Sequence, residues 1–77
     1  MSPRLPRVTG RDVLRALAHT GWSVHHVEGS HHYLRHPDHP GMRVTVAVHA
    51  GETIKLKTLA TIIKQAGLTA EQFDDLL

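Results

Sequence analysis

The chain has 77 residues and no cysteine, so we expect one small domain whose core forms without disulfides or cysteine-bound zinc. Residues 1–64 hold all nine Lys and Arg against four acids, a net charge of +5, whereas residues 65–77 carry −3. A basic body with an acidic tail suits a polyanionic partner, although ordinary surface charge gives the same distribution. No apolar run approaches the roughly 20 residues of a membrane span, and residues 1–7 lack the apolar centre of a signal peptide, so we expect a cytoplasmic protein.

The start of the chain predicts an arm followed by a helix. Residues 1–8 contain two prolines and are predicted to form a flexible N-terminal arm, with a single domain over residues 9–77. Thr9 is the predicted N-cap of a helix over residues 10–20, because Asp12 follows at the spacing of a capping box. Apolar residues then recur at helical spacing until a glycine ends the pattern.

Three strands are predicted next. Residues 22–27 are rich in β-forming side chains, residues 28–30 form a turn, and residues 31–36 continue as the second strand of a hairpin. Two prolines and a glycine make residues 37–41 a turn. Residues 42–49 alternate valine with other side chains, which predicts a strand with one buried and one exposed face.

Two helices complete the predicted order. After a loop at residues 50–53, apolar spacing predicts a helix over residues 56–66, ended by Gly67. Thr69 and Gln72 form a second capping-box pattern, which predicts a short third helix. The order α-β-β-β-α-α predicts an α+β fold in which a three-stranded antiparallel sheet carries its helices on one face and leaves the other open.

Eight histidines are the unusual feature of the composition, because histidine titrates near neutral pH. Residues 29–37 read Gly-Ser-His-His-x-x-Arg-His-Pro, which places histidines beside a flexible turn at the start of a strand. Strand alternation sets His31, Tyr33 and Arg35 on the open face and turns His32 toward the helices. The open face is therefore the predicted ligand side.

These residues suit RNA cleavage without a metal. A base takes the proton of the ribose 2′-hydroxyl, which attacks the adjacent phosphorus, and an acid protonates the leaving 5′-oxygen; histidine serves in either role. Arg35 suits phosphate and Tyr33 suits stacking on a base. The lysines of the second predicted helix, Lys55, Lys57 and Lys64, are candidates for further phosphate contacts. Carboxylates are too scattered for a two-metal site, and no metal or cofactor is expected.

Each assignment has a simpler alternative. A histidine on a strand is more often a surface residue than a catalyst, and the lysines match an ordinary solvated helix face. His32, if it points at the helices, is better explained as a core-edge residue bonded to backbone. At the level of function, the alternatives are a non-catalytic RNA-binding module and a protein whose only ligand is another protein.

From about residue 5 to its end the chain resembles the HicA toxins, also called the YcfA-like family. The Gly-Ser-His-His element is the most specific part of the likeness, and its order relative to the later Val-His strand strengthens it. The stretches that carry the resemblance are Leu5–Val13, Gly21-Trp22, Gly29–His32, Arg35–Pro37, Val44–His49, Thr58-Leu59 and Gln65–Leu68.

The resemblance implies a double-stranded-RNA-binding-like fold and a toxin that cleaves mRNA without a metal until a HicB antitoxin neutralises it. It places the catalytic histidine in the Gly-Ser-His element, which maps to His31, with Gly29 and Ser30 as the supporting turn. His32 is the reserve candidate, because two adjacent histidines align ambiguously. His49 is a lower-ranked helper in RNA contact.

Two positions depart from the family pattern. Ala47 stands where relatives often carry proline, and Lys57 stands where they often carry glycine. We expect neither position to touch the histidine pair. The first affects the edge of the third strand, and the second adds a charge at a helix start that bears on RNA or antitoxin contact.

Overall fold

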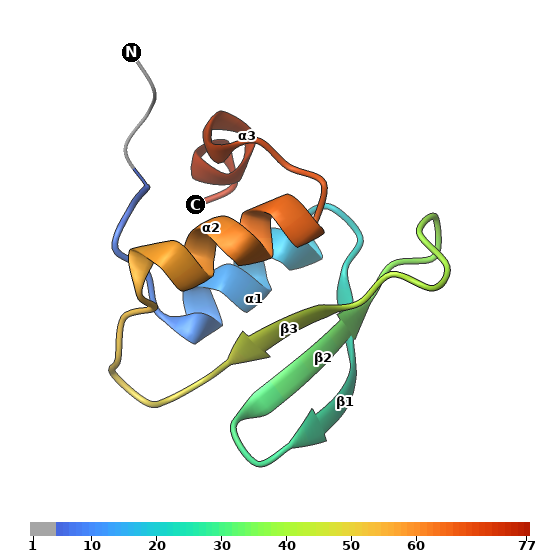
Figure 1. Cartoon of the computed structure of the whole chain (residues 1–77), viewed down its shortest axis with the longest axis horizontal. Coiled ribbons are helices and arrows are strands. Elements are labelled where there is room, and N and C mark those ends of the chain that lie inside the picture. The colour runs from blue at the N-terminus through green and yellow to red at the C-terminus, as the bar shows by residue number, and fades with distance from the viewer. Residues whose placement is uncertain (1–4) are drawn as a thin grey trace.

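The computed structural model describes residues 5–77, in which a three-stranded antiparallel sheet carries helices on one face (Figure 1). The elements are α1 (Gly10–Ala18), β1 (Ser23–Glu28), β2 (His31–Arg35), β3 (Val44–Ala47), α2 (Leu56–Gln65) and α3 (Ala70–Asp75). The strands lie in the order β1-β2-β3. The predicted α+β class, element order and double-stranded-RNA-binding-like layering are confirmed.

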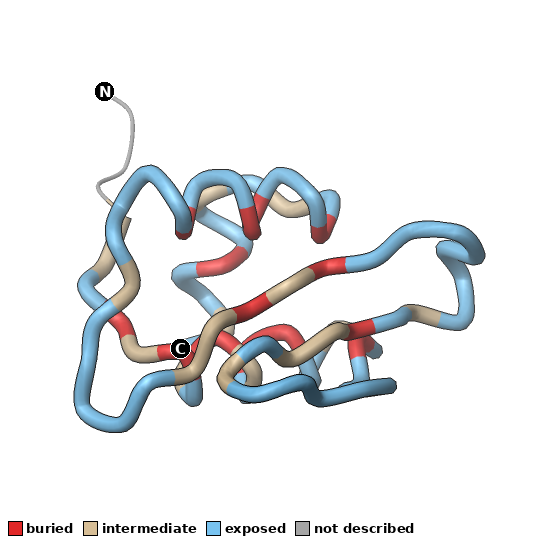
Figure 2. The backbone as a smooth tube through the Cα atoms, turned by 60° about the horizontal axis from the view of Figure 1, so that its bottom comes forward, coloured by how far each residue is buried: buried red, intermediate tan, exposed pale blue. Residues whose placement is uncertain are grey.

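The core lies between the sheet and the helices. Leu34 of β2 is paired with Val44 of β3, and His32 is paired with Val46; the two valines and Leu34 are buried. Figure 2 shows buried positions of the helices turned toward those of the strands. Because side chains alternate along a strand, His32 lies on the helix-facing side and Tyr33 on the open side, as the alternation predicted.

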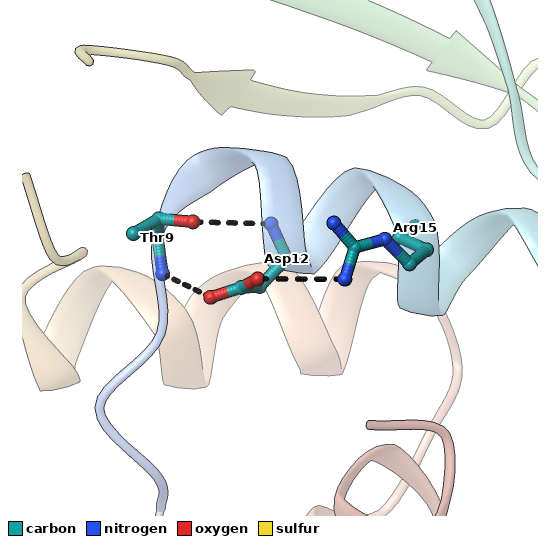
Figure 3. Close-up of polar contacts among 3 residues, drawn as sticks. All are labelled: Thr9, Asp12 and Arg15. Carbon is teal, nitrogen blue, oxygen red and sulfur yellow. Dashed lines mark hydrogen bonds and ion pairs between the residues drawn. The ribbon is translucent and has the colours of Figure 1, made fainter. Parts of the chain in front are cut away.

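The helix starts follow from local sequence. At α1 the Thr9 hydroxyl accepts the N–H of Asp12 at 3.2 Å, and the Asp12 carboxylate accepts the N–H of Thr9 at 3.0 Å (Figure 3). Thr69 and Gln72 make the same reciprocal pair at α3. Both predicted capping boxes are confirmed, and each satisfies backbone donors that the first turn leaves unpaired.

Two elements are shorter than predicted by two residues or more, and β2 and α2 each end one residue early. The helix predicted over residues 10–20 ends at Ala18, because the Trp22 N–H turns back to donate to the Leu17 carbonyl at 3.2 Å. The strand predicted over residues 42–49 is reduced to Val44–Ala47. A strand extends only as far as its partner does, and β2 offers this strand four paired residues.

Strand β1 is an exposed edge with an irregularity that the sequence did not reveal. Val24 pairs with Leu34, but His26 pairs with Tyr33, so the register shifts at His25. All six residues of β1 are exposed. The extra residue, His25, forms a β-bulge. As a result His26 lies opposite Tyr33, whereas a regular register would place it opposite His32.

The predicted N-terminal arm falls partly on residues 1–4, which lie outside the described residues. Within the described part, Val8 is buried in the core, and its carbonyl accepts the N–H of Ile54 at 2.7 Å. Thr9 and Thr53 form an isolated antiparallel bridge beside it. The boundary between arm and domain stays a prediction.

Across residues 5–77, no helix has the length and apolar character needed to cross a membrane.

Candidate functional site

The turn between β1 and β2, residues 29–30, precedes the histidine pair His31 and His32 and is hydrogen-bonded to the segment that follows β3. Gly29 has φ +60°, and an added Cβ would meet nothing within 4 Å among residues 5–77, so its backbone conformation alone favours glycine. The Ser30 carbonyl accepts the N–H of Val48 at 2.8 Å and lies 3.2 Å from Nδ1 of His32. The turn is thereby fixed to the end of β3.

His32 has an oriented ring. A carbonyl oxygen only accepts, so the contact with Ser30 requires that Nδ1 of His32 carries the hydrogen. In the neutral ring this leaves the lone pair on Nε2, which is the arrangement that a general base needs. His32 is half-buried, as expected for a core-edge residue bonded to backbone, and the same geometry also suits proton transfer.

His31 lies on the opposite side of the strand. It is exposed, and the sheet register places it between Glu28 of β1 and Ala47 of β3. The expectation that Ala47 lies away from the histidine pair is therefore wrong, because Ala47 is the cross-strand neighbour of His31. Adjacent side chains of a strand point to opposite faces, so the two histidines serve different surfaces. The geometry gives His31 the accessibility expected of it and gives His32 the defined ring orientation.

A groove of about 310 Å³ lies next to this turn, where the end of β3, the following loop and the start of α2 meet. It contains His49 and Lys55, two of the residues predicted to contact RNA. The Val48–Ser30 hydrogen bond links this region to the turn. The residues that line the groove are Ala47, His49, Glu52, Thr53, Ile54, Lys55 and Thr58.

The start of α2 adds positive charge to the groove. Lys55 is its N-cap and, within the described chain, supplies no side-chain hydrogen bond, and no acid stands in the first turn. The free N–H groups and the helix dipole favour an anion there, and Lys57 is exposed beside them. Lys64 lies in the last turn, about 13 Å along the axis from Lys55, so the structure does not bring it to this end.

The open face of the sheet holds a second group of predicted residues. Tyr33 stacks with His26 at a centroid distance of 5.7 Å and 19° between planes, and the guanidinium of Arg43 lies 4.8 Å from its ring centre. Arg35 lines the same hollow of about 320 Å³. His26 and Arg43 were not among the predicted site residues. Alternation along β3 signals that Arg43 faces outward, but the bulge that brings His26 to Tyr33 had no signal.

His36, which belongs to the same sequence pattern, has a different place. Its Nδ1 accepts the N–H of Asp38 at 3.0 Å, so Nε2 carries the hydrogen and donates to the Thr20 carbonyl at 2.6 Å. Trp22 meets its ring edge-on at 5.3 Å and stacks with His39 at 5.9 Å. This cluster closes the end of the sheet away from the Gly-Ser turn.

A metal site needs several ligating side chains close together. Among residues 5–77, no three His, Asp or Glu side chains come close enough together to hold an ion. The expectation that function needs neither metal nor cofactor rests on the sequence and stays a prediction.

Comparison with known proteins adds a family. The family model described as "HicA toxin of bacterial toxin-antitoxin" matches residues 10–68. That span includes the turn, the groove and the open face of the sheet, and stops before α3. A search of curated proteins finds no match.

Proposed function

The chain belongs to the HicA toxin family of bacterial toxin–antitoxin systems, and on that basis we propose that it is a metal-independent endoribonuclease that cleaves mRNA in the cytoplasm. The observation that carries the proposal is the histidine pair at the Gly29-Ser30 turn. One ring is exposed at the strand start, and the other is oriented by the Ser30 carbonyl. A groove that contains His49 and Lys55 adjoins the same turn.

The proposed reaction is attack by the 2′-hydroxyl on the adjacent phosphorus. A histidine of the pair takes the hydroxyl proton, the bond from phosphorus to the 5′-oxygen breaks, and an acid protonates that oxygen. The resemblance assigns this histidine to His31, with His32 in reserve. The products are a 2′,3′-cyclic phosphate, or the 3′-phosphate formed from it by water, and a 5′-hydroxyl end.

The groove supplies the charge that this reaction needs. Negative charge grows on the phosphorane oxygens as the hydroxyl attacks, and fixed cations or N–H donors beside them lower the barrier. Lys55 and the open N-terminus of α2 lie at the groove and are candidates for this role. His49 lines the same groove and is a candidate for the second proton transfer.

The test is cleavage of a 5′-labelled mRNA fragment in EDTA by the native protein and by His31→Ala, His32→Ala and His19→Ala. His19 is exposed at the end of α1 and serves as the matched histidine control. Loss of one catalytic histidine is expected to slow cleavage by about 10²–10⁴-fold. His19→Ala is expected to cleave at the native rate.

Other results decide against the proposal. Dependence on magnesium with 5′-phosphate products excludes 2′-hydroxyl attack. Equal cleavage by the native protein and both turn variants removes the histidine pair from the chemistry. RNA binding without cleavage by the native protein favours the second candidate, a non-catalytic RNA-binding module, for which Lys55 and Lys57 at the start of α2 are the supporting feature.

Membership of a toxin–antitoxin family implies an antitoxin partner. We propose that this partner is of the HicB type and covers the turn and the open face of the sheet, because masking the site is the simplest form of inhibition. The check is cleavage in the presence of the purified antitoxin. Complete inhibition together with protection of residues 29–35 from hydrogen exchange is the expected result.

A further inference from the structure

The open face of the sheet carries an aromatic and cationic cluster that lies outside the groove. Tyr33 is stacked by His26 and lies under the Arg43 guanidinium, and Arg35 lines the same hollow. These side chains come from all three strands or their immediate ends, and the sheet fixes their spacing. The cluster is therefore assembled before any ligand arrives.

We propose that His26, Tyr33, Arg35 and Arg43 form a platform for single-stranded RNA that holds the nucleotides next to the cleaved bond. The inference rests on the proposed nuclease function and deepens it by assigning the part that binds substrate. Aromatic side chains on a sheet stack on unpaired bases, and arginines beside them neutralise phosphates.

The position of the platform connects it to the proposed chemistry. Tyr33 lies two residues beyond His31 on the same face of β2, a separation of about 7 Å along the strand. A base bound at Tyr33 therefore belongs to a nucleotide close to a phosphate at His31. Arg35, two residues further, continues the same line away from the turn.

The cluster fits a single strand better than a duplex. In a double helix the faces of the bases are covered by their neighbours, and the ring of Tyr33 has no base face to meet. In a single strand the base faces are free, and stacking tolerates any sequence. Basic groups alone would serve both forms equally, so the aromatic stack carries the distinction.

The cluster also fits RNA better than an acidic peptide. Glu28 lines the same hollow, and its carboxylate lies 4.0 Å from Nε2 of His26. This carboxylate accepts a hydrogen bond from the amino group of a base, whereas an acidic peptide would meet it as a like charge. The hollow thus combines acceptor, ring and guanidinium groups, as base recognition requires.

The test uses a fluorescent ten-nucleotide RNA whose 2′-hydroxyls are methylated, so that it binds without being cleaved. Its dissociation constant is measured by anisotropy for the native protein, Arg43→Ala, Arg35→Ala, Tyr33→Ala and Arg11→Ala, and the measurement is repeated with a duplex of the same sequence. Arg11 is an exposed arginine of α1, on the layer that covers the other face of the sheet, and is the matched charge control.

We expect Arg43→Ala and Arg35→Ala to weaken binding about tenfold each and to reduce the salt dependence by about 0.7 per lost phosphate contact. Tyr33→Ala removes the ring and should weaken binding of the single strand about tenfold, while binding of duplex RNA should change by less than twofold. Arg11→Ala should change binding by less than twofold.

The platform is overturned if the two arginine variants bind as the native protein does, or if Arg11→Ala weakens binding as much. It is also overturned if Tyr33→Ala weakens duplex RNA as much as single-stranded RNA, or if the platform variants lose affinity for the antitoxin alone. Failure of the nuclease proposal has a different signature, because native protein that binds through this face but never cleaves leaves the platform intact.

Discussion

The two ends of strand β2 both carry histidines, and the structure holds them in opposite ways. At the end that leads into the turn before β3, both ring nitrogens of His36 form hydrogen bonds, one to the Thr20 carbonyl and one to the Asp38 N–H. At the other end, His32 forms a hydrogen bond within residues 5–77 through Nδ1 alone, to the Ser30 carbonyl. His31 beside it is exposed.

This difference separates a structural histidine from one that is free to move a proton. The pair of bonds at His36 requires the neutral ring with its hydrogen on Nε2, and protonation of Nδ1 would break the bond to Asp38. His32 keeps Nε2 outside such a bond pair, so it has a nitrogen available for proton transfer. The hydrogen-bond partners of each ring nitrogen therefore distinguish the roles of these histidines, whereas the number of histidines in the motif does not.

The largest effect on stability is expected at Gly21, which adjoins His36. Its φ is +96°, and a Cβ there would lie 2.6 Å from Nε2 of His36. Gly21→Ala should lower the free energy of unfolding by about 3 kcal/mol, from backbone strain and a displaced hydrogen bond. Urea denaturation measures this value, and cleavage per folded molecule should stay near native.

A double-mutant cycle sharpens that prediction. In a His36→Ala background the ring is absent, so Gly21→Ala introduces backbone strain but no clash. It should then lower the free energy of unfolding by only about 1–2 kcal/mol. Full additivity of the two changes would show that the contact between Gly21 and His36 contributes nothing.

The second effect is expected from His36→Ala itself. It removes two hydrogen bonds and the edge contact with Trp22, and should lower the free energy of unfolding by about 2 kcal/mol. Cleavage per folded molecule should fall by no more than about threefold, because the proposed proton transfer uses the other end of β2. A hundredfold loss of cleavage with native stability would reverse the comparison between the two ends.

A smaller effect is expected at Gly29, on the turn of the histidine pair. Its φ is also positive, but an added Cβ meets nothing within 4 Å in the described part of the chain. Gly29→Ala should therefore lower the free energy of unfolding by about 1–2 kcal/mol, and Gly29→Asn by less, since asparagine tolerates this conformation. A loss equal to that of Gly21→Ala would mean that the turn is more tightly packed than the structure indicates.

Much of the fold was predictable because its signals are local. The capping boxes at Thr9 and Thr69 need only a spacing of three residues. The alternating valines of β3 indicate which face of the strand is buried. The same alternation placed Tyr33 and Arg35 on the open face. Such features depend on neighbours in the chain, which the sequence displays directly.

The remaining features depend on partners far away in the chain. The bulge at His25 is defined only by how β1 meets β2, and it decides that His26 reaches Tyr33. The acceptor for His36 lies sixteen residues earlier, at Thr20, so no local pattern marks that histidine as structural. The sequence therefore shows where the histidines of this site lie in the chain, but it does not show which are structural and which are free to transfer a proton.

The smallest expected effect concerns the cap of α1, which packs against the turn end of the sheet. A Cβ on Gly10 would lie 2.7 Å from the Ala47 carbonyl, so the first turn of α1 is in direct contact with β3. The N–H of Thr9, and then its hydroxyl, lower the pKa of Asp12 below its ordinary value of 3.8. Arg15, 3.8 Å away, contributes least (Figure 3).

The sign of the resulting pH effect follows from that direction. A carboxyl whose pKa is lower in the folded chain stabilises it above pH 3.8, and this contribution fades as the pH falls from there through the folded value. Asp12→Asn keeps an acceptor for the Thr9 N–H but does not titrate. The difference in unfolding free energy between the native protein and Asp12→Asn should therefore be constant from pH 7 to 5 and shrink toward pH 2. Because other carboxyls titrate in both proteins, only the difference isolates Asp12, and a difference independent of pH would show that the bond to Thr9 does not favour the charged form.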